Sequence, residues 1–280
     1  MSARPSSRGV LVGVDGSASA TAALRWAVAE ARVRATTLCV VHVAADTDDV
    51  LDEAVAIATT DTVDEAPHVT GVRLAGSPAG VLARQSQDAE MVVVGRHGDA
   101  TRLHRLLGSV TTGVLHHAHC PVAVVHADPT PTGASIHTNR QPVLVGVDGS
   151  RWSAAAVEVA FAEASARGVG VLALYVCDEA EQTPEARRRS SFWIEEGQEI
   201  LAQALAPLRQ RHPTVPVHTL IRFEDPARQL LTQGERAQLI VVGSHGRGAV
   251  AGLLLGSVST AVASEMRNPV IVVRCGHRAT

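Results

Sequence analysis

The sequence contains the same eight residues twice. VLVGVDGS occupies positions 10–17 and returns letter for letter at positions 143–150. A second repeated stretch lies toward the end of each copy, LLGSVT at 106–111 and LLGSVS at 254–259. Repeats that keep the same order along a chain indicate an internal duplication. The chain is therefore predicted to fold as two similar units in tandem.

Each unit alternates short apolar runs with stretches of helical periodicity. The predicted strands of the first unit are 10–14, 38–43, 69–74, 91–94 and 122–125, and those of the second are 143–147, 169–176, 215–221, 239–242 and 270–273. The helices between them include a long one at 184–211 in the second unit, and the last predicted helix ends near residue 267. Alternating strands and helices favour a parallel sheet covered on both faces. We therefore expect an α/β fold with two doubly wound, five-stranded parallel sheets.

The stretch between the two units has the composition of a linker. Its first half holds Pro129, Pro131 and Gly133, among Thr, Ser and Asn residues that break regular structure. We place the first domain at 1–126, the linker at 127–141 and the second domain at 142–280.

Composition excludes several classes of function. The formal net charge is −3, which offers no electrostatic footprint for nucleic acid, and aromatic residues make up only 2% of the chain. All 25 basic residues are arginine, so lysine nucleophiles and P-loop lysines are excluded. No apolar run reaches 18 residues, and the segment MSARPSSRG lacks the apolar core of a signal peptide. We expect a cytoplasmic protein that binds no membrane.

A glycine-rich loop follows the fourth predicted strand of each unit. The pattern G-x2-G-x9-G-S runs from Gly95 to Ser109 and again from Gly243 to Ser257, where a helix is predicted to begin. Glycines allow close backbone approach, and the N–H groups of a helix N-terminus favour anions. Arg247 is a possible charge partner inside the second loop. The two loops are therefore predicted to bind phosphate groups.

These motifs resemble those of the universal stress protein family. The glycine pattern and the first-strand VGVDGS both occur twice, and the resemblance covers the chain apart from the N-terminal tail and the linker. It implies an adenine-nucleotide alpha hydrolase-like fold with strand order 3-2-1-4-5 in each domain. It also implies ATP, with Mg²⁺, at the C-terminal ends of the first and fourth strands.

Carried over position by position, the resemblance assigns roles to residues of both units. Loop N–H groups and the Ser257 hydroxyl would hold the triphosphate, Asp148 would lie near the ribose or the phosphate-bound Mg²⁺, and the Val176 backbone would contact adenine. The second-unit set is Gly146, Asp148, Val176, Gly243, Ser244, His245, Gly246, Arg247, Gly248, Gly256, Ser257, Val258 and Ser259. The first-unit set is Gly13, Asp15, Val43, Gly95, Arg96, His97, Gly98, Gly108, Ser109 and Val110.

Two kinds of residue in these sets have simpler alternatives. Asp15 and Asp148 each sit in an Asp-Gly-Ser turn, where a carboxylate also organises the turn and helps to cap the next helix. His97 and His245 have no visible orienting partner for acid–base work, which favours backbone contact with a ligand. No catalytic residue and no metal ligated by the protein alone are predicted.

The first loop departs from the pattern of the second. Arg96 replaces a small residue, Ser244, and Asp99 stands about where Arg247 does. An aspartate beside phosphates is unfavourable, because like charges repel. The second unit is therefore the better match to an ATP site.

The resemblance implies an ATP-binding regulatory module for stress or dormancy. A slow ATP hydrolase and a scaffold without nucleotide are the alternatives, and the lack of a strong base or lysine disfavours efficient catalysis. The family pairs domains along the last strand, so an internal pseudo-dimer through 122–125 and 270–273 is expected. A homodimer of chains and an unidentified protein partner are expected in addition.

Overall fold

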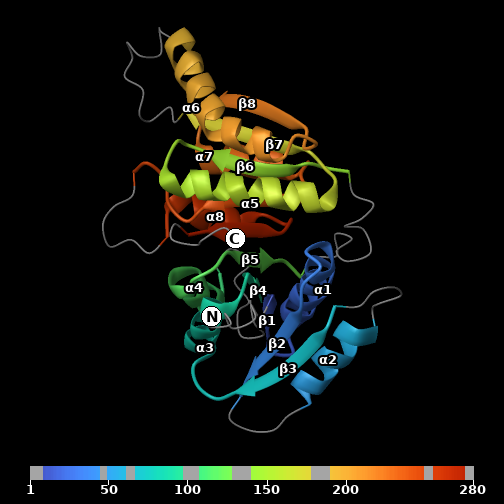
Figure 1. The fold of residues 1–280 in the computed structure, drawn as a ribbon. Coiled ribbons are helices and arrows are strands. Elements are labelled where there is room, and N and C mark those ends of the chain that lie inside the picture. The colour runs from blue at the N-terminus through green and yellow to red at the C-terminus, as the bar shows by residue number, and fades with distance from the viewer. Residues whose placement is uncertain are drawn as a thin grey trace, which may run out of the picture. The chain divides into compact units, whose positions relative to one another are not determined.

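The computed structural model describes residues 9–44, 49–60, 67–96, 107–127, 140–177, 190–248 and 255–274. The chain divides into two compact units, Met1–Thr138 and Asn139–Thr280 (Figure 1). In the part of the chain that the structure describes, no helix combines the length and the apolar character needed to cross a membrane.

The first unit is a parallel sheet with the strand order β3-β2-β1-β4-β5, in which every neighbouring pair is parallel. Its strands are β1 (Val10–Val14), β2 (Leu38–Val43), β3 (Val69–Leu74), β4 (Met91–Gly95) and β5 (Val122–Val125). Its helices are α1 (Ala18–Val33), α2 (Val50–Thr60), α3 (Pro78–Gln85) and α4 (Ser109–His117), with a 3-10 turn at Ser86–Asp88.

The second unit repeats this topology, with the strand order β8-β7-β6-β9-β10. Its strands are β6 (Val143–Val147), β7 (Val171–Cys177), β8 (Val217–Phe223), β9 (Leu239–Gly243) and β10 (Val270–Val273). Its helices are α5 (Arg151–Arg167), α6 (Ser190–Arg211), α7 (Pro226–Gly234) and α8 (Ser257–Glu265). The predicted order 3-2-1-4-5 is confirmed in the first unit, and the second unit has the same order.

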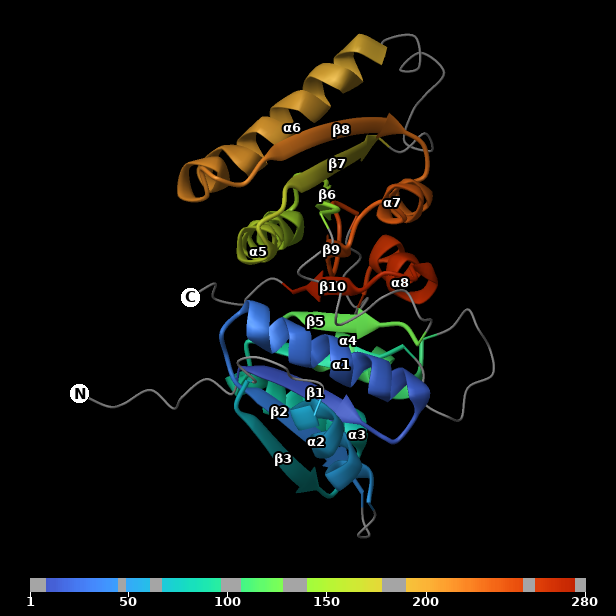
Figure 2. The ribbon, with the colours of Figure 1, turned by 90° about the vertical axis from the view of Figure 1, so that its right-hand side faces the viewer.

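Helices cover both faces of each sheet. In the second unit α5 and α6 lie on one face and α7 and α8 on the other, and α1 and α2 are opposite α3 and α4 in the first unit (Figure 2). The direction of winding reverses between the neighbouring strands β1 and β4 in the first unit, and between β6 and β9 in the second. Such a switch point is where ligands bind in doubly wound sheets. The predicted doubly wound α/β class is confirmed.

The core consists of small aliphatic side chains, as the low aromatic content requires. Val10, Leu11 and Val12 of β1 are all fully buried, because both faces of the strand are covered. Against this strand, α1 buries a stripe of Ala23, Ala27 and Ala31 at a spacing of four residues. Small residues in this stripe allow the helix to lie close to the sheet.

The two units differ most in the second helix. α6 has 22 residues and α2 has 11. Gly16 and Gly149 are equivalent turn glycines with φ +82°, and a Cβ at each would meet Val50 and Ile200 respectively. Val50 is the first residue of α2, so the residues of α6 before Ile200 form an additional segment that α2 lacks.

Some element boundaries differ from the predicted ones. The strand predicted at 215–221 is observed as β8 at Val217–Phe223, because Pro216 has no N–H with which to join the ladder. The last helix was predicted to end near residue 267 but ends at Glu265, and the backbone is already extended at Met266. Pro269 disfavours a helical conformation at Asn268, so the helix stops before these residues and the chain enters β10. Residues 184–189, predicted to begin the long helix, lie outside the described part of the chain.

Candidate functional site

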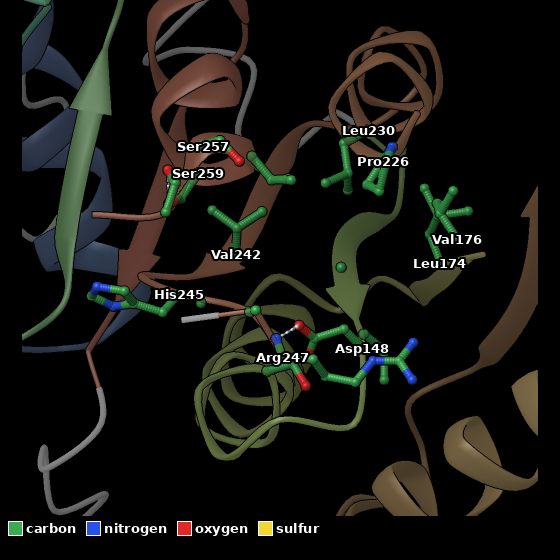
Figure 3. Close-up of a pocket in the computed structure, with 18 residues that line it drawn as sticks. Asp148, Leu174, Val176, Pro226, Leu230, Val242, His245, Arg247, Ser257 and Ser259 are labelled. Atoms are coloured by element: carbon green, nitrogen blue, oxygen red, sulfur yellow. Dashed lines mark hydrogen bonds between the residues drawn. The ribbon is translucent and has the colours of Figure 1, made fainter. Parts of the chain in front are cut away.

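A cavity of about 410 Å³ lies at the C-terminal ends of the central strands of the second unit (Figure 3). It is lined by β6, β7 and β9, the glycine loop, and the N-terminal turns of α7 and α8. Every predicted second-unit site residue except Ser244 lines this cavity. Ligand pockets span about 300–1,000 Å³, so the cavity has the size of a small-molecule site.

One wall of the cavity is an apolar slot. Its side chains come from β7, β9 and α7: Leu174, Val176, Val242, Pro226 and Leu230. Gly146 completes this wall, because a Cβ there would lie 3.4 Å from a methyl group of Leu230. Only Val176 and Gly146 were predicted. Two signals could have predicted further residues of this wall. Pro226 and Leu230 are four residues apart on one face of α7, and Leu174 points to the same face of the sheet as Val176.

The opposite wall is the glycine loop, and its two ends are fastened together. Gly256 N–H donates to the carbonyl of Ser244 at 2.8 Å, and the Ser259 hydroxyl donates to the same carbonyl at 3.0 Å. Ser244 is joined to β10 through its N–H, which donates to the Val273 carbonyl at 2.7 Å. The loop therefore leaves β9 and returns to α8 at one point. The hydroxyl of Ser259 thus holds the two ends of the loop together. The sequence predicted Ser259 as a ligand-binding residue and did not indicate this structural role.

α8 begins beside the cavity with an extended glycine. Gly256 is the N-cap residue, with φ −72° and ψ 156°, and it has no side chain to occupy the N–H groups of the first turn. The first three residues of the helix, Ser257, Val258 and Ser259, all line the cavity. Unpaired N–H groups at a helix N-terminus, together with the positive end of the helix dipole, favour a phosphate or another anion.

Asp148 both organises its own turn and faces the cavity. Its Oδ1 accepts a hydrogen bond from Ser150 N–H at 2.8 Å, and its Oδ2 accepts one from Arg247 N–H at 3.1 Å. Ser150 in turn caps α5 by accepting from Ser153 N–H. In the first unit Asp15 accepts a hydrogen bond from Ser17 N–H at 3.0 Å in the same way. The turn-forming role is thus present in both units, and in the second unit the aspartate also contacts the glycine loop.

Arg247 lines the cavity but directs its guanidinium away from it. Figure 3 shows this side chain leading away from Ser257 and Ser259. Its Nη2 donates to the Tyr175 hydroxyl at 2.8 Å, and its Nη1 lies 3.6 Å from a carboxylate oxygen of Glu196. Partial burial opposes the charge, but the hydrogen bond to Tyr175 and the nearby carboxylates raise the pKa of Arg247 above its usual value. Arg247 therefore remains cationic outside the phosphate-facing wall.

His245 contributes a ring at the edge of the cavity. It packs against the indole of Trp152 with ring centroids 5.3 Å apart, and its Nδ1 lies 3.0 Å from the Ser244 hydroxyl. The guanidinium of Arg151 lies over the other ring of this pair, 4.5 Å from the Trp152 centroid. These contacts join the glycine loop to the first turn of α5.

The first unit closes its glycine loop in the same manner. Gly108 N–H donates to the Arg96 carbonyl at 2.9 Å, and the Thr111 hydroxyl donates to the Gly95 carbonyl at 2.7 Å. Thr111 is the counterpart of Ser259, and sequence analysis did not include it. Ser109 and Val110 begin α4 after the extended Gly108, as in the second unit. His97 and Gly98 lie outside the described residues.

Two features distinguish the first unit from the second. The Arg96 side chain is buried, and this burial lowers its pKa from the usual value. A Cβ on Gly13 would lie 2.7 Å from Leu82, whereas one on Gly146 would lie 3.4 Å from Leu230. The apolar wall next to β1 is therefore tighter in the first unit than the wall next to β6 is in the second.

Val43, the predicted adenine contact of the first unit, ends β2. It lies beside the buried His42, whose Nδ1 donates to the Val14 carbonyl at 2.8 Å.

Two doubly wound domains in tandem, each with a closed glycine loop at the switch point, define the class of protein. A model of the universal stress protein family matches residues 7–126 and 139–274. The chain belongs to the universal stress protein family and carries two of its domains.

Relatives with the same domain organisation extend over nearly the whole chain. A universal stress protein of Mycobacterium tuberculosis is 36% identical over 98% of this chain and 99% of its own. One from Mycolicibacterium smegmatis is 38% identical over 95% of this chain and 97% of its own. The crystal structure of a universal stress protein from Archaeoglobus fulgidus covers 96% of this chain and 98% of its own, at 24% identity and a TM-score of 0.67. This last likeness supports the fold.

One solved universal stress protein among the matches is a complex with a nucleotide. A universal stress protein in complex with cAMP matches 44% of this chain and 100% of its own, at 27% identity and a TM-score of 0.38.

Proposed function

We propose that this protein is a nucleotide-dependent regulatory module that binds ATP in the cavity of the second unit. One observation carries the proposal: a single cavity combines an apolar slot, an uncapped helix N-terminus and a glycine loop held closed. An adenine nucleotide has the matching parts, an apolar ring system at one end and a polyanion at the other. Membership of the universal stress protein family supports the same ligand class.

Each wall of the cavity suits one part of ATP. The slot formed by Leu174, Val176 and Leu230 would bind adenine and exclude water from its apolar surface. The N–H groups at the start of α8 and along the glycine loop would bind the phosphate oxygens, where the helix dipole is favourable. Asp148 would lie toward the ribose, with its carboxylate already oriented by two N–H donors.

Mg²⁺ would enter this site as a ligand of the phosphates. Among the described residues, no group of three or more His, Cys, Asp or Glu side chains is placed to hold a metal ion. Mg²⁺ is commonly held by one or two carboxylates together with substrate phosphates. In this cavity Asp148 is the carboxylate available for that purpose, and it corresponds to Asp15 in the first unit.

The proposal extends to the first unit in a modified form. The loop closure through Thr111 and Gly108 is similar, although the Thr111 hydroxyl donates to Gly95, one residue before the counterpart of Ser244, so the N–H groups at the start of α4 would serve the same purpose. Arg96 and the tighter contact of Leu82 with Gly13 would alter the affinity there. We propose that the protein acts as a cytoplasmic homodimer, and that nucleotide occupancy controls its contact with a protein partner during stress or dormancy.

The experiment that tests this function counts nucleotides in the purified protein. The full chain is purified without added ligand and denatured, and the released nucleotides are identified by chromatography and counted per chain. Two ATP per chain would support both sites, and one ATP whose recovery falls in Gly246→Ala would assign it to the second unit. Recovery of ADP in place of ATP would favour slow hydrolysis. No nucleotide, and no binding of added ATP with Mg²⁺, would contradict the proposal.

A further inference from the structure

Arg247 connects three parts of the second unit that are distant in the sequence. Its backbone N–H donates to Asp148 after β6, and its guanidinium donates to Tyr175 of β7 and faces Glu196 of α6. The guanidinium also lies 5.4 Å from the centroid of the Tyr175 ring. One residue of the glycine loop is therefore held at both its main chain and its side chain.

Tyr175 projects from the face of the sheet opposite to the apolar slot. Its neighbours Leu174 and Val176 both line the cavity, whereas Tyr175 does not and is only 1% exposed. Its ring packs against α6 at Gly197, where a Cβ would lie 2.8 Å from a ring carbon. A glycine at this position permits the helix to approach the tyrosine, and it places the adjacent Glu196 beside Arg247.

The contacts of Arg247 and Tyr175 with α6 are made in the N-terminal turns of that helix. The corresponding helix of the first unit, α2, lacks these turns. Ile200 corresponds to Val50, the first residue of α2, so Glu196 and Gly197 lie in the additional N-terminal turns. The counterpart of Tyr175 is His42, whose Nδ1 donates to the Val14 carbonyl. The contact with Arg247 is thus an addition to the shared fold of the two domains.

The two side-chain contacts of Arg247 differ in strength. The hydrogen bond to Tyr175 is 2.8 Å long, and its acceptor belongs to a side chain that is almost fully buried. The Glu196 contact is longer, at 3.6 Å, between side chains that are 43% and 32% exposed, and exposed ion pairs are weak. Tyr175 is therefore the main anchor, and Glu196 ties that anchor to α6.

We propose that Arg247 is a positioning residue whose attachment to Tyr175 and Glu196 couples nucleotide occupancy of the second unit to the docking of residues 193–199 of α6. This inference rests on the proposed function. The anchored guanidinium holds the Gly246–Arg247 peptide against Asp148, so the loop is ordered before the nucleotide arrives. A preordered loop loses less conformational entropy on binding, which strengthens affinity. Linkage then requires that bound nucleotide stabilise the docked turns of α6 by the same factor.

The test combines hydrogen exchange of the full chain with ATP binding in three variants. Tyr175→Phe removes the hydroxyl and keeps the ring, Glu196→Gln removes the charge, and Glu195→Gln is the matched control on an exposed neighbour. Without nucleotide, the amides of residues 244–248 should exchange faster in the first two variants than in the wild type and the control. With ATP and Mg²⁺, residues 193–199 should become protected in the wild type and the control. We expect about fivefold weaker ATP binding in Tyr175→Phe, at the low end of typical couplings.

The outcomes separate this inference from the proposed function. ATP binding by the wild type with unchanged exchange of residues 193–199 would overturn the coupling and leave the ATP site intact. Loop exchange rates in Tyr175→Phe equal to those of the control would overturn the positioning role, whether or not nucleotide binds. A wild-type chain that binds no ATP would overturn the proposed function and the coupling together. A merely structural role for Tyr175 would lower stability without altering the protection that ATP gives to α6.

Discussion

The main-chain N–H of Arg247 donates a hydrogen bond to Oδ2 of Asp148 at 3.1 Å, across 99 residues of sequence. This contact joins the Asp-Gly-Ser turn after β6 to the glycine loop after β9. It forms because β6 and β9 are neighbouring parallel strands, with Val143 opposite Leu239, so their C-terminal ends meet at one edge of the sheet. The two motifs that each unit repeats therefore converge on one cavity in the second unit.

The first prediction concerns Gly246 beside this hydrogen bond. An alanine Cβ at Gly246 would lie 2.7 Å from Oδ2 of Asp148, closer than real Cβ contacts, so the carboxylate or the loop must move. We expect Gly246→Ala to weaken ATP binding to the second unit by about tenfold, or about 1.4 kcal/mol. Titration calorimetry with ATP and Mg²⁺ measures the change.

Gly248→Ala is the comparison for that variant. Among the described residues, a Cβ at Gly248 would meet no heavy atom within 4 Å, so the same substitution in the same loop displaces none of them. Its loss of affinity should be smaller than that of Gly246→Ala. Equal affinity of Gly246→Ala and the wild type would refute the site assignment.

The second prediction concerns stability at the end of β9. A Cβ on Gly243 would lie 2.8 Å from the carbonyl carbon of Trp152, which belongs to the backbone of α5. Backbone atoms cannot rotate aside, so Gly243→Ala should destabilise the second unit by about 1–3 kcal/mol, as overpacking does. Urea denaturation measures the loss. Gly80→Ala is the control, because its Cβ would come no closer than 3.7 Å to any residue that the structure describes.

The third prediction uses the indole beside the cavity. Trp152 packs against His245, which lines the cavity, so a ligand bound in the cavity should alter the Trp152 environment. We expect ATP to change the intrinsic fluorescence, and Trp152→Phe to remove that change. With selective excitation of tryptophan, a signal that persists in Trp152→Phe would have to come from Trp26 or Trp193, and would contradict this prediction.

The fourth prediction compares two ion pairs of α5, one within the helix and one between α5 and α6. Glu163 and Arg167 of α5 pair with each other and are both 2% exposed, whereas Glu158 pairs with Arg211 at side-chain exposures of 41% and 58%. Removing one partner of a buried pair costs about 3–5 kcal/mol, so we expect Arg167→Ala to destabilise the second unit by roughly 3 kcal/mol. Arg211→Ala should cost less than about 1 kcal/mol, as exposed pairs do. Similar losses of stability in the two variants would contradict the prediction.

The fifth prediction concerns the buried thiol of Cys120. Burial raises its pKa from 9.0 to about 12, although the Val92 backbone and Arg34 oppose the shift. The neutral thiol therefore stabilises the native state fully below pH 9.0, and this contribution is lost as the pH rises toward about 12. Alkylation at pH 8, with sites located by mass spectrometry, should leave Cys120 unmodified until the chain is denatured. Modification in the native chain would show that the thiol is accessible.

Most of the fold was predictable because it follows from local patterns. The runs around Val10–Val14 and Val143–Val147 are buried on both faces, so they carry the continuous apolar sequence that identifies a central parallel strand. The starts of α4 and α8 were predicted correctly at Ser109 and Ser257, each after an extended glycine. The start of β8 was placed too early, because Pro216, which has no N–H to donate to the ladder, was included in the predicted strand.

The candidate site was predictable only in its repeated parts. The loop glycines and Asp148 occur in motifs, and a motif can be read without knowing its neighbours. Pro226 and Leu230 look like ordinary residues of an amphipathic helix. They become a wall of the cavity because right-handed crossovers place α7 beside Gly146.

The sequence by itself determined that this chain is a duplicated α/β protein of the universal stress protein family with a phosphate-type loop in each copy. Tertiary structure decided which wall Leu230 forms, how Ser259 and Thr111 close the loops, and that the Arg247 side chain turns away from the cavity toward Tyr175. The physical reason is distance along the chain. Strands, turns and helix starts arise from interactions within a few residues, whereas Arg247 and Tyr175 are 72 residues apart and meet only when the sheet and α6 have packed.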